Sequence, residues 1–577
     1  RLAAFELAKA ERQYAEQGHG NLSLVPFGYG DGGGGPNREM LAKAHRTADL
    51  EGSPKVRIGN PAEFFTEAQA ELDRPHTWSG EMYLETHRGT YTSQLRTKQG
   101  NRRSEHLLRA AELWASAAAI RAGLAYPSAL LQECWETVLL QQFHDILPGS
   151  SIAWVHREAE ANYARVAAVL EGIIERSLGA LAGDGDVPLS VNSAPVTVDG
   201  VGPLRVVPAL EAGGGRLDVR LTAEGWLVDT GEITALMTPP GLIDSVRHHA
   251  SGRELVAPGR HFGLLQVHND RPSMYEAWDI DAHIGRSVTD LIEAQSVLLV
   301  GQDDGHVQFS VIRQLGDRTV ITERITLHAG SALIDFDFDI DWHEQRRLLK
   351  LAFPTSIFTD RAASEIQFGH IFRPTYVNTS WDTARYETVA HRWVQVAEPG
   401  FGFAVANDST YGHDIRRENS GSRSPGTTVR LSLLRGPMFP DPQTDQGRHQ
   451  LRVTAVCGAD LADAFAAGQR LNQPVRRITG ARPVAPIVEA SGPGVVVEAV
   501  KLAEDGSGDL VVRLYESLGD RVCGTLRPGF GFDQVLTTDL LERTIDPEPE
   551  LTEDGMVRLT LRPFEILTLR FTGVRAA

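Results

Sequence analysis

The chain has 577 residues, and 42% of them are hydrophobic, so it is long enough to form several domains with apolar cores. Its formal net charge of −18 at pH 7 argues against nucleic acid and anionic membrane surfaces as partners, because both attract clustered lysine and arginine side chains. No run of about 18 apolar residues indicates a membrane-spanning helix, so we expect no membrane contact.

A glycine-rich stretch near the start of the chain has several interpretations. Residues Leu22–Phe27 predict a buried strand, and residues 28–33 fit the GxGxxG pattern, with Asp49 about 20 residues further on, as in a dinucleotide site. Against that interpretation, Asp31 lies inside the loop, where its carboxylate would repel a pyrophosphate. Alternatively, the glycines let the backbone approach a ligand, and Asp31 projects from a strand end as a catalytic acid. A plain turn aspartate is the remaining alternative.

Helices dominate the first 180 residues or so. One is predicted over residues 40–50, and a second begins at Asn60, which precedes a first-turn proline and a glutamate at the capping-box position. Three longer helices follow, each with apolar residues at the three-and-four spacing of one buried face, over residues 101–122, 127–147 and 152–178. Short links join these three helices, which favours a compact helical bundle.

A histidine and an aspartate stand together at the end of the second long helix. Pro148-Gly149 stops that helix, and His144 lies off its apolar stripe, in the last turn. A neutral imidazole there can bind a metal ion, and Asp145 can accept hydrogen bonds from ligand hydroxyl groups. The alternative is a surface histidine with an ordinary capping aspartate. The apolar stripe consists of Leu131, Trp135, Val138, Leu139, Phe143 and Ile146.

After residues 183–185 the hydrophobic period changes from 3.6 to 2, which predicts a mainly antiparallel β region. Within it, apolar residues at even positions from Ile334 to Trp342 alternate with aspartates at odd positions from Asp335 to Asp341. This alternation places the apolar side chains on one face of a strand and the acids on the other. We expect a solvated outer face for the acids, with a calcium site as the alternative, because water must screen like charges along one strand.

Several longer motifs resemble the glycoside hydrolase family 38 α-mannosidases. They appear in the family's order, from the glycine run at 27–36, through Gly80–Gln94 and Asn101–Glu105, to the pair His144-Asp145. Segments in the β region that also look like this family are 278–281, 341–344, 378–382 and 411–414.

The resemblance implies a multidomain α+β fold. It consists of the terminal part of an α/β barrel, a three-helix bundle middle domain, and large antiparallel β-sandwich domains. The expected divisions are a barrel remnant (1–60), the bundle (61–182), a first β domain (183–290), a large β-sandwich (291–480) and a C-terminal β domain (481–577).

The resemblance also implies a zinc-dependent retaining exo-α-mannosidase that acts on terminal mannose of an oligosaccharide or glycan. Asp31 would be the general acid/base, His144 a ligand of the single Zn²⁺ ion, and Asp145 a residue that holds a sugar hydroxyl. Nothing before Asn21 matches the family's zinc-binding His-x-Asp or its later aspartate nucleophile. We therefore expect a fragment with an incomplete zinc site. A non-catalytic carbohydrate-binding or scaffolding β protein is the alternative function.

Other polar residues are weaker candidates, for which we expect mainly structural roles. A family-like motif contains Glu81, Glu85, His87 and Arg88. A β loop carries Tyr411, His413 and Asp414, and two tryptophans are candidates for stacking on a sugar, Trp278 and Trp381.

The chain has only three cysteines, Cys134, Cys457 and Cys523, so we expect neither a disulfide framework nor a cysteine-rich metal site. This favours a cytoplasmic location. A homo-oligomer is a further possibility that the sequence leaves open.

Overall fold

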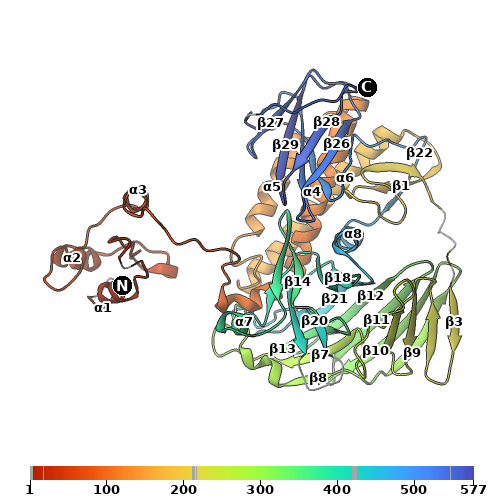
Figure 1. Cartoon of the computed structure of the whole chain (residues 1–577), viewed down its shortest axis with the longest axis horizontal. Helices are drawn as coiled ribbons and strands as arrows, with labels where there is room; N and C mark the ends of the chain where they lie inside the picture. Colours follow the sequence, from red (N-terminus) through yellow and green to blue (C-terminus); the bar gives the residue numbers. More distant parts are fainter. Residues whose placement is uncertain are drawn as a thin grey trace. The chain divides into compact units, whose positions relative to one another are not determined.

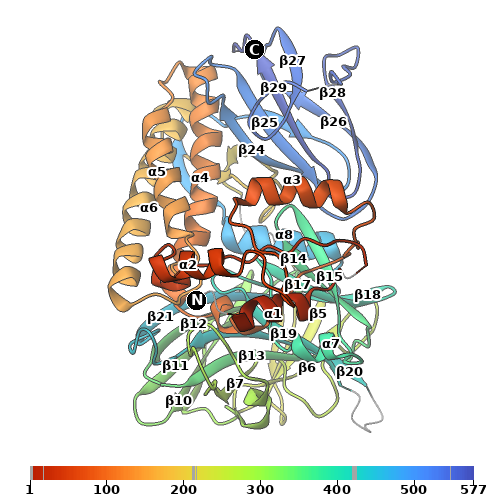
Figure 2. The ribbon, with the colours of Figure 1, turned by 90° about the vertical axis from the view of Figure 1, so that its left-hand side faces the viewer.

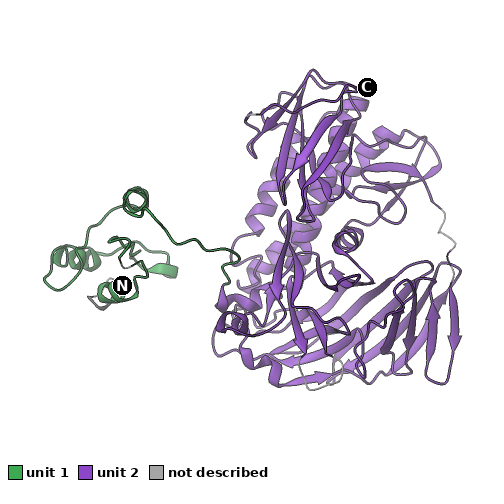
Figure 3. Cartoon of the chain, in the orientation of Figure 1, with its two compact units in different colours: residues 1–83 green, residues 84–577 purple. Residues whose placement is uncertain are grey.

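The computed structural model describes residues 4–16, 18–210, 215, 217–418, 425–545 and 547–576. The chain divides into two compact units, residues 1–83 and residues 84–577 (Figure 3).

Unit 1 is built from short helices. They are α1 (Ala4–Gln13), the 3-10 turn η1 (Gly30–Gly32), α2 (Arg38–Arg46) and α3 (Pro61–Glu71). The predicted start of α3 is confirmed, because the Asn60 side chain accepts a hydrogen bond of 3.0 Å from the backbone N–H of Glu63. The helix predicted over residues 40–50 is shorter than expected, since α2 already ends at Arg46.

The strand predicted at Leu22–Phe27 is wrong. Residues 21–27 belong to no helix or strand, and Leu24 is 42% exposed. A strand needs hydrogen bonds to a neighbouring strand, and the described part of unit 1 contains no strand that could pair with this segment. Without that strand, the glycine run also lacks the strand–loop–helix context that the dinucleotide interpretation requires.

Unit 2 begins with the 3-10 segment η2 (Glu85–Tyr91) and three long helices, α4 (Leu95–Ala122), α5 (Ser128–Gln141) and α6 (Ala153–Ala182). The three long helices lie side by side, as Figures 1 and 2 show, and the predicted helical bundle is confirmed. No helix in the described ranges is long and apolar enough to cross a membrane.

Two large antiparallel sheets form the central β-sandwich. A nine-stranded sheet has the order β15 (Gly369–Pro374), β14 (Arg361–Ile366), β17 (Trp393–Glu398), β18 (Phe401–Asn407), β21 (Gly447–Cys457), β12 (Leu333–Trp342), β11 (Thr319–His328), β10 (His306–Leu315) and β9 (Ser296–Gln302). A six-stranded sheet has the order β16 (Thr388–Val389), β19 (Gly412–Glu418), β20 (Gly426–Arg435), β13 (Arg347–Thr355), β7 (Leu264–Asn269) and β8 (Val288–Asp290).

Smaller elements complete unit 2. The helices are η3 (Ala282–Arg286), α7 (Ser380–Ala384) and α8 (Leu461–Asn472), and α8 packs on β17, β18 and β21. One three-stranded sheet is β2 (Arg205–Pro208), β1 (Val187–Asn192) and β22 (Arg476–Gly480), and one four-stranded sheet is β3 (Asp218–Leu221), β4 (Trp226–Asp229), β5 (Ile233–Met237) and β6 (Ile243–His248). The C-terminal sheets are β23 (Val488–Ala490), β26 (Val522–Pro528) and β28 (Val557–Leu561), and β24 (Val495–Leu502), β25 (Leu510–Glu516), β29 (Ile566–Thr572) and β27 (Gln534–Thr538).

Two large apolar cores hold unit 2 together. The first lies between the nine-stranded and six-stranded sheets and includes Phe336, Trp342 and Phe353. The second is shared between α4–α6 and the C-terminal sheets, with Leu108 and Leu170 in the same cluster as Leu514. The helical bundle is therefore stabilised by strands more than 300 residues further along the chain.

The acid-bearing strand is β12. Its apolar side chains are buried as predicted, from Ile334 to Trp342. The expectation of a merely solvated acid face is wrong, because Asp335 accepts hydrogen bonds from Arg470, and Asp339 accepts one of 2.7 Å from Arg448. Arginines from neighbouring elements, rather than water alone, thus offset repulsion among these acids. Within the described ranges, no group of three His, Cys, Asp or Glu residues is arranged to hold a metal ion.

Candidate functional site

His144 and Asp145 lie in a series of turns after α5 rather than in its last turn. The helix ends at Gln141, and residues 142–149 form turns with hydrogen bonds such as that from Ile146 N–H to Phe143 O, at 2.8 Å. The predicted helix end at residue 147 is therefore wrong. The apolar spacing suggested a longer helix, but the apolar side chains near its end do not pack into a core. Leu139 is 57% exposed and Phe143 is 53% exposed.

Polar side chains of α4 form hydrogen bonds to the turn segment, residues 142–149. The ammonium group of Lys98 donates to Leu147 O at 2.9 Å and also contacts Ser93 O. The Gln142 amide donates to Asn101 Oδ1 and to Glu105 Oε1, both at 3.0 Å. Because Lys98 is fully buried, desolvation lowers its pKa to about 7. The turn segment is thus fixed to the helical bundle by buried polar contacts.

Gly149 sets the path of the chain behind the histidine. Its φ of +80° lies in the left-handed region, and a β-carbon at this position would overlap the carbonyl oxygen of Ser93. Directly after it, the hydroxyl of Ser150 donates to Asp145 Oδ1 at 2.7 Å. The glycine brings the turn close to η2 and α4, and the serine orients the aspartate.

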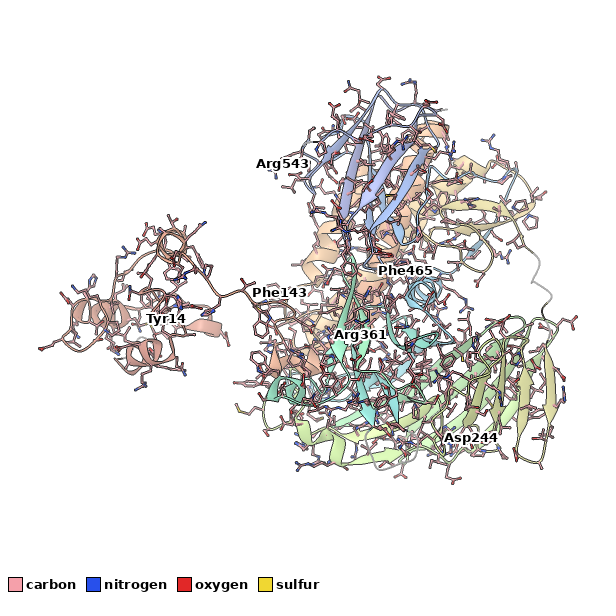
Figure 4. The ribbon with its side chains drawn as sticks, viewed as in Figure 1. Tyr14, Phe143, Asp244, Arg361, Phe465 and Arg543 are labelled. Atoms are coloured by element: carbon pink, nitrogen blue, oxygen red, sulfur yellow. The ribbon has the colours of Figure 1, made fainter. Side chains whose placement is uncertain are left out.

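The imidazole of His144 is accessible. Its side chain is 79% exposed, that of Asp145 is 37% exposed, and His144 Nε2 lies 3.4 Å from Asp145 Oδ2. The Phe143 ring, labelled in Figure 4, lies 4.2 Å from the imidazole between centroids. A histidine in this position is free to bind a ligand from solvent, unlike a satisfied core histidine.

Large apolar side chains on both sides of this pair in the sequence are exposed. They include Leu140 at 64% and Trp154 at 69%, together with Leu139, Phe143 and Ile152. Large exposed apolar side chains are common on binding surfaces.

Asp31 belongs to unit 1, whereas His144 and Asp145 belong to unit 2. It lies in the turn η1 and is exposed. Gly28, Gly30 and Gly33 flank it with positive φ angles, and Tyr29 N–H donates to Gly34 O at 2.9 Å. The glycines therefore close a tight loop that presents the carboxylate to solvent, but residues 21–27 before it form no strand, so the expected position of Asp31 at a strand end is wrong.

The described residues do not complete a zinc site. A catalytic zinc ion needs about three protein ligands, and no such group of His, Cys, Asp and Glu occurs in the described ranges. Within the described part of unit 2, Asp145 is the acidic residue that pairs with His144. His144 can supply one ligand, but not a site by itself.

Most of the weaker candidates are buried and form contacts within the protein. Arg88 is buried, donates to Ala384 O at 3.1 Å and lies 3.2 Å from Asp279, so it anchors η2 to the β region. His413 is also buried, with Nε2 3.2 Å from Ser364 Oγ, and the Asp414 carboxylate accepts a 2.7 Å hydrogen bond from Lys350. Trp381, in α7, is 57% exposed.

The sequence analysis missed the residue that fixes the start of α4. The carboxylate of Asp445 accepts hydrogen bonds from the backbone N–H groups of Gln94, at 3.1 Å, and Leu95, at 2.8 Å. Burial raises the pKa of Asp445 to about 7, and Lys98 is the nearby opposing charge. No local pattern could reveal this contact, because about 350 residues separate the partners.

Comparison with known families defines the class of protein. Four regions match glycosyl hydrolases family 38: the N-terminal domain (residues 2–81), the alpha mannosidase middle domain (85–181), the C-terminal domain (228–443) and the C-terminal beta sandwich domain (494–569). The chain belongs to glycosyl hydrolase family 38, and the resemblance inferred from its motifs is confirmed.

Individual relatives agree with this assignment. The chain is 34% identical to human alpha-mannosidase 2C1 over 98% of its own length and 57% of the relative's, and 29% identical to alpha-mannosidase of Saccharomyces cerevisiae over 95% and 54%. It therefore spans little more than half the length of these curated relatives. A solved family 38 protein from Enterococcus faecalis has the same fold, with a TM-score of 0.73 at 15% identity, over 98% of this chain and 78% of that one.

Proposed function

We propose that the chain is the C-terminal part of a zinc-dependent retaining exo-α-mannosidase that removes terminal mannose from oligosaccharides or glycans. Its family membership and its relatives named α-mannosidases support the activity. The observation that carries the proposal is the accessible His144–Asp145 pair, held on a turn that Gly149 and Lys98 fix in place.

In the proposed reaction Asp31 is the general acid/base. A retaining glycosidase uses two carboxyl groups about 5 to 5.5 Å apart, one to attack the anomeric carbon and one to protonate the departing oxygen and then activate water. The exposed carboxylate of Asp31 in its glycine loop suits the second role. We assign no residue to the first role. Asp145, oriented by Ser150, is proposed to accept a hydrogen bond from a mannose hydroxyl.

His144 is proposed as one zinc ligand, with the others outside the described residues. The test uses the complete gene product and measures bound zinc by mass spectrometry for wild type, His144→Ala and His283→Ala. His283 is a matched control because it too is an exposed histidine beside an aspartate, Asp281, at 3.7 Å. We expect His144→Ala to lose most of its zinc while the control keeps about one equivalent. Full zinc occupancy in His144→Ala would remove this residue from the ligand set.

The alternative is a non-catalytic carbohydrate-binding or scaffolding protein. We expect these 577 residues alone not to hydrolyse aryl α-mannosides even with added zinc, since the described residues supply no three-ligand site. The alternative applies if the complete gene product is inactive as well.

A cytoplasmic location and self-association remain proposals; the exposed apolar side chains around His144 support self-association. The five-part domain division also remains a proposal.

A further inference from the structure

A large cavity lies within unit 2, between the helical bundle and the central β-sandwich. Its volume is about 910 Å³. The helical wall comes from α4 and α6, the floor from β11, β12 and β21, and the end of α8 and the start of β22 close one side. Asp31, His144 and Asp145 are not among the residues that line it, so the inference below does not rest on the proposed function.

The walls of this cavity are polar and balanced in charge. Five arginines and five carboxylates line it, together with amide side chains such as Gln99, Gln450 and Asn472. A polyanion such as a nucleotide would meet five carboxylates there, and a divalent cation would find no group of three ligands in the described ranges. The walls therefore favour a ligand that is neutral and rich in hydrogen-bonding groups.

Two charged groups on the floor face the cavity without a direct ion pair: the half-buried Asp337 and the exposed Arg324. Asp337 on β12 stands directly opposite Arg324 on β11 and Arg452 on β21. Among the described residues, no ion pair within 4 Å and no hydrogen bond joins the side chain of Asp337 or that of Arg324, although the neighbouring Arg452 pairs with Asp408. Burial, and then the nearby Asp335, raise the pKa of Asp337. A partly buried carboxylate without a donor is costly, and a ligand hydroxyl would supply one.

Buried polar atoms in the wall show the same deficit. Side-chain atoms Ser104 Oγ, His106 Nδ1, Tyr163 Oη and Gln473 Oε1 are buried and have no hydrogen-bond partner within the described part of the chain. All four residues line the cavity. Because these atoms have almost no accessible surface, they lie behind the cavity surface and show that the wall is polar in its interior, while the groups that can contact a ligand are those exposed to the cavity.

We propose that this cavity is a binding site for a neutral polyhydroxylated ligand, an oligosaccharide of two or three sugar units. The carboxylate and guanidinium groups of Asp337 and Arg324 can each contact two neighbouring hydroxyls, because both groups are planar with paired hydrogen-bonding atoms. The amide groups of Gln99 on α4, Gln450 on β21 and Asn472 on α8 supply further donors and acceptors around the cavity. The volume suits such a ligand, since small-molecule sites commonly span about 300 to 1,000 Å³.

The test is titration calorimetry of the purified chain with α-linked mannotriose and, separately, with maltotriose. The double variant Arg324→Gln with Asp337→Asn removes both floor charges. Its matched control is Arg318→Gln with Asp317→Asn, which makes the same changes on the exposed turn between β10 and β11. We expect the wild type and the control to bind at least one of the two sugars, and the floor variant to bind it at least tenfold more weakly.

A second variant separates a loss of binding from a loss of folding. Arg103 lies on the opposite wall, on the exposed surface of α4, so Arg103→Gln should weaken binding without lowering the melting temperature. Binding of neither sugar by the wild type would overturn the proposal and identify a water-filled cleft. Equal binding by the floor variant and its control would overturn it as well. Binding of inorganic phosphate in preference to both sugars would contradict the charge-balance argument and with it the proposal.

Discussion

At the scale of single residues, the candidate site depends on groups that never touch a ligand. Gly149 permits the turn, Lys98 holds the Leu147 carbonyl, and Ser150 orients Asp145. His156, at the start of α6, closes the far end of the same segment, because its Nε2 accepts a hydrogen bond of 3.3 Å from Ser151 N–H. The position of His144 is therefore a property of this supporting group.

Gly149→Ala should disturb the His144 turn. The new β-carbon would overlap Ser93 O in a left-handed conformation, so we expect a destabilisation of more than about 1 kcal/mol and faster hydrogen exchange over residues 142–150. Gly123→Ala is the matched control, since Gly123 also has a positive φ, of +67°, but has free space around it. If both variants lose the same stability, the close contact at Ser93 is not what requires glycine at position 149.

His156→Gln should make the protein less sensitive to acid. Burial, and then Lys98, lower the pKa of His156 from 6.5 to about 4. Between these two values the unfolded chain binds a proton that the folded imidazole does not, so stability falls as the pH drops through this window, by up to about 1.4 kcal/mol per pH unit. The glutamine does not titrate. Melting temperatures at pH 7 and pH 5 should therefore differ less in the variant than in the wild type, and an equal or larger difference would contradict the assignment.

At the scale of whole elements, hydrophobic spacing predicted that helices exist but not where they end. The stripe along α5 continues into residues 142–149, yet Leu139 and Phe143 are exposed and the chain turns. The start of α4 was also placed late, because Leu95 is fixed by a distant carboxylate rather than by a local cap. Spacing reports which residues are apolar, whereas helix ends are set by hydrogen-bond partners that lie elsewhere in the chain.

Asp445→Ala should cost more stability than the loss of an ordinary cap. The carboxylate satisfies two N–H groups at the start of α4, and its removal leaves both buried without a partner, so we expect a loss of about 2 to 3 kcal/mol. Asp460→Ala is the control: Asp460 is an exposed N-cap of α8, for which about 1 kcal/mol is typical. Chemical unfolding followed by far-ultraviolet circular dichroism measures both. Equal losses of unfolding free energy would show that the buried cap contributes no more to stability than the exposed one.

At the scale of the molecule, the sequence predicted the kinds of element and their order but not which of them share a core. The bundle and the sandwich class were visible in the hydrophobic periods, and the family suggested by the motifs is confirmed, while the roles of His144 and Asp145 stay predictions. The pairing of the acids on β12 with Arg448 and Arg470 was not visible, and neither was the polar cavity above that strand. These features arise from contacts between segments more than 100 residues apart, for which a single sequence carries no local signal.

The shared core predicts a long-range effect on the helices. Leu514 lies in the cluster that joins the C-terminal sheets to α4–α6, and Leu514→Ala should cost about 2 to 5 kcal/mol through lost burial and the cavity left behind. Because α4 packs against β24, part of that loss should appear as faster hydrogen exchange in α4, which contains no mutated residue. Leu351→Ala makes the same change in the other core and should instead affect the central sandwich. If exchange in α4 responds equally to both substitutions, the two cores unfold as one, and the bundle has no particular dependence on the C-terminal strands.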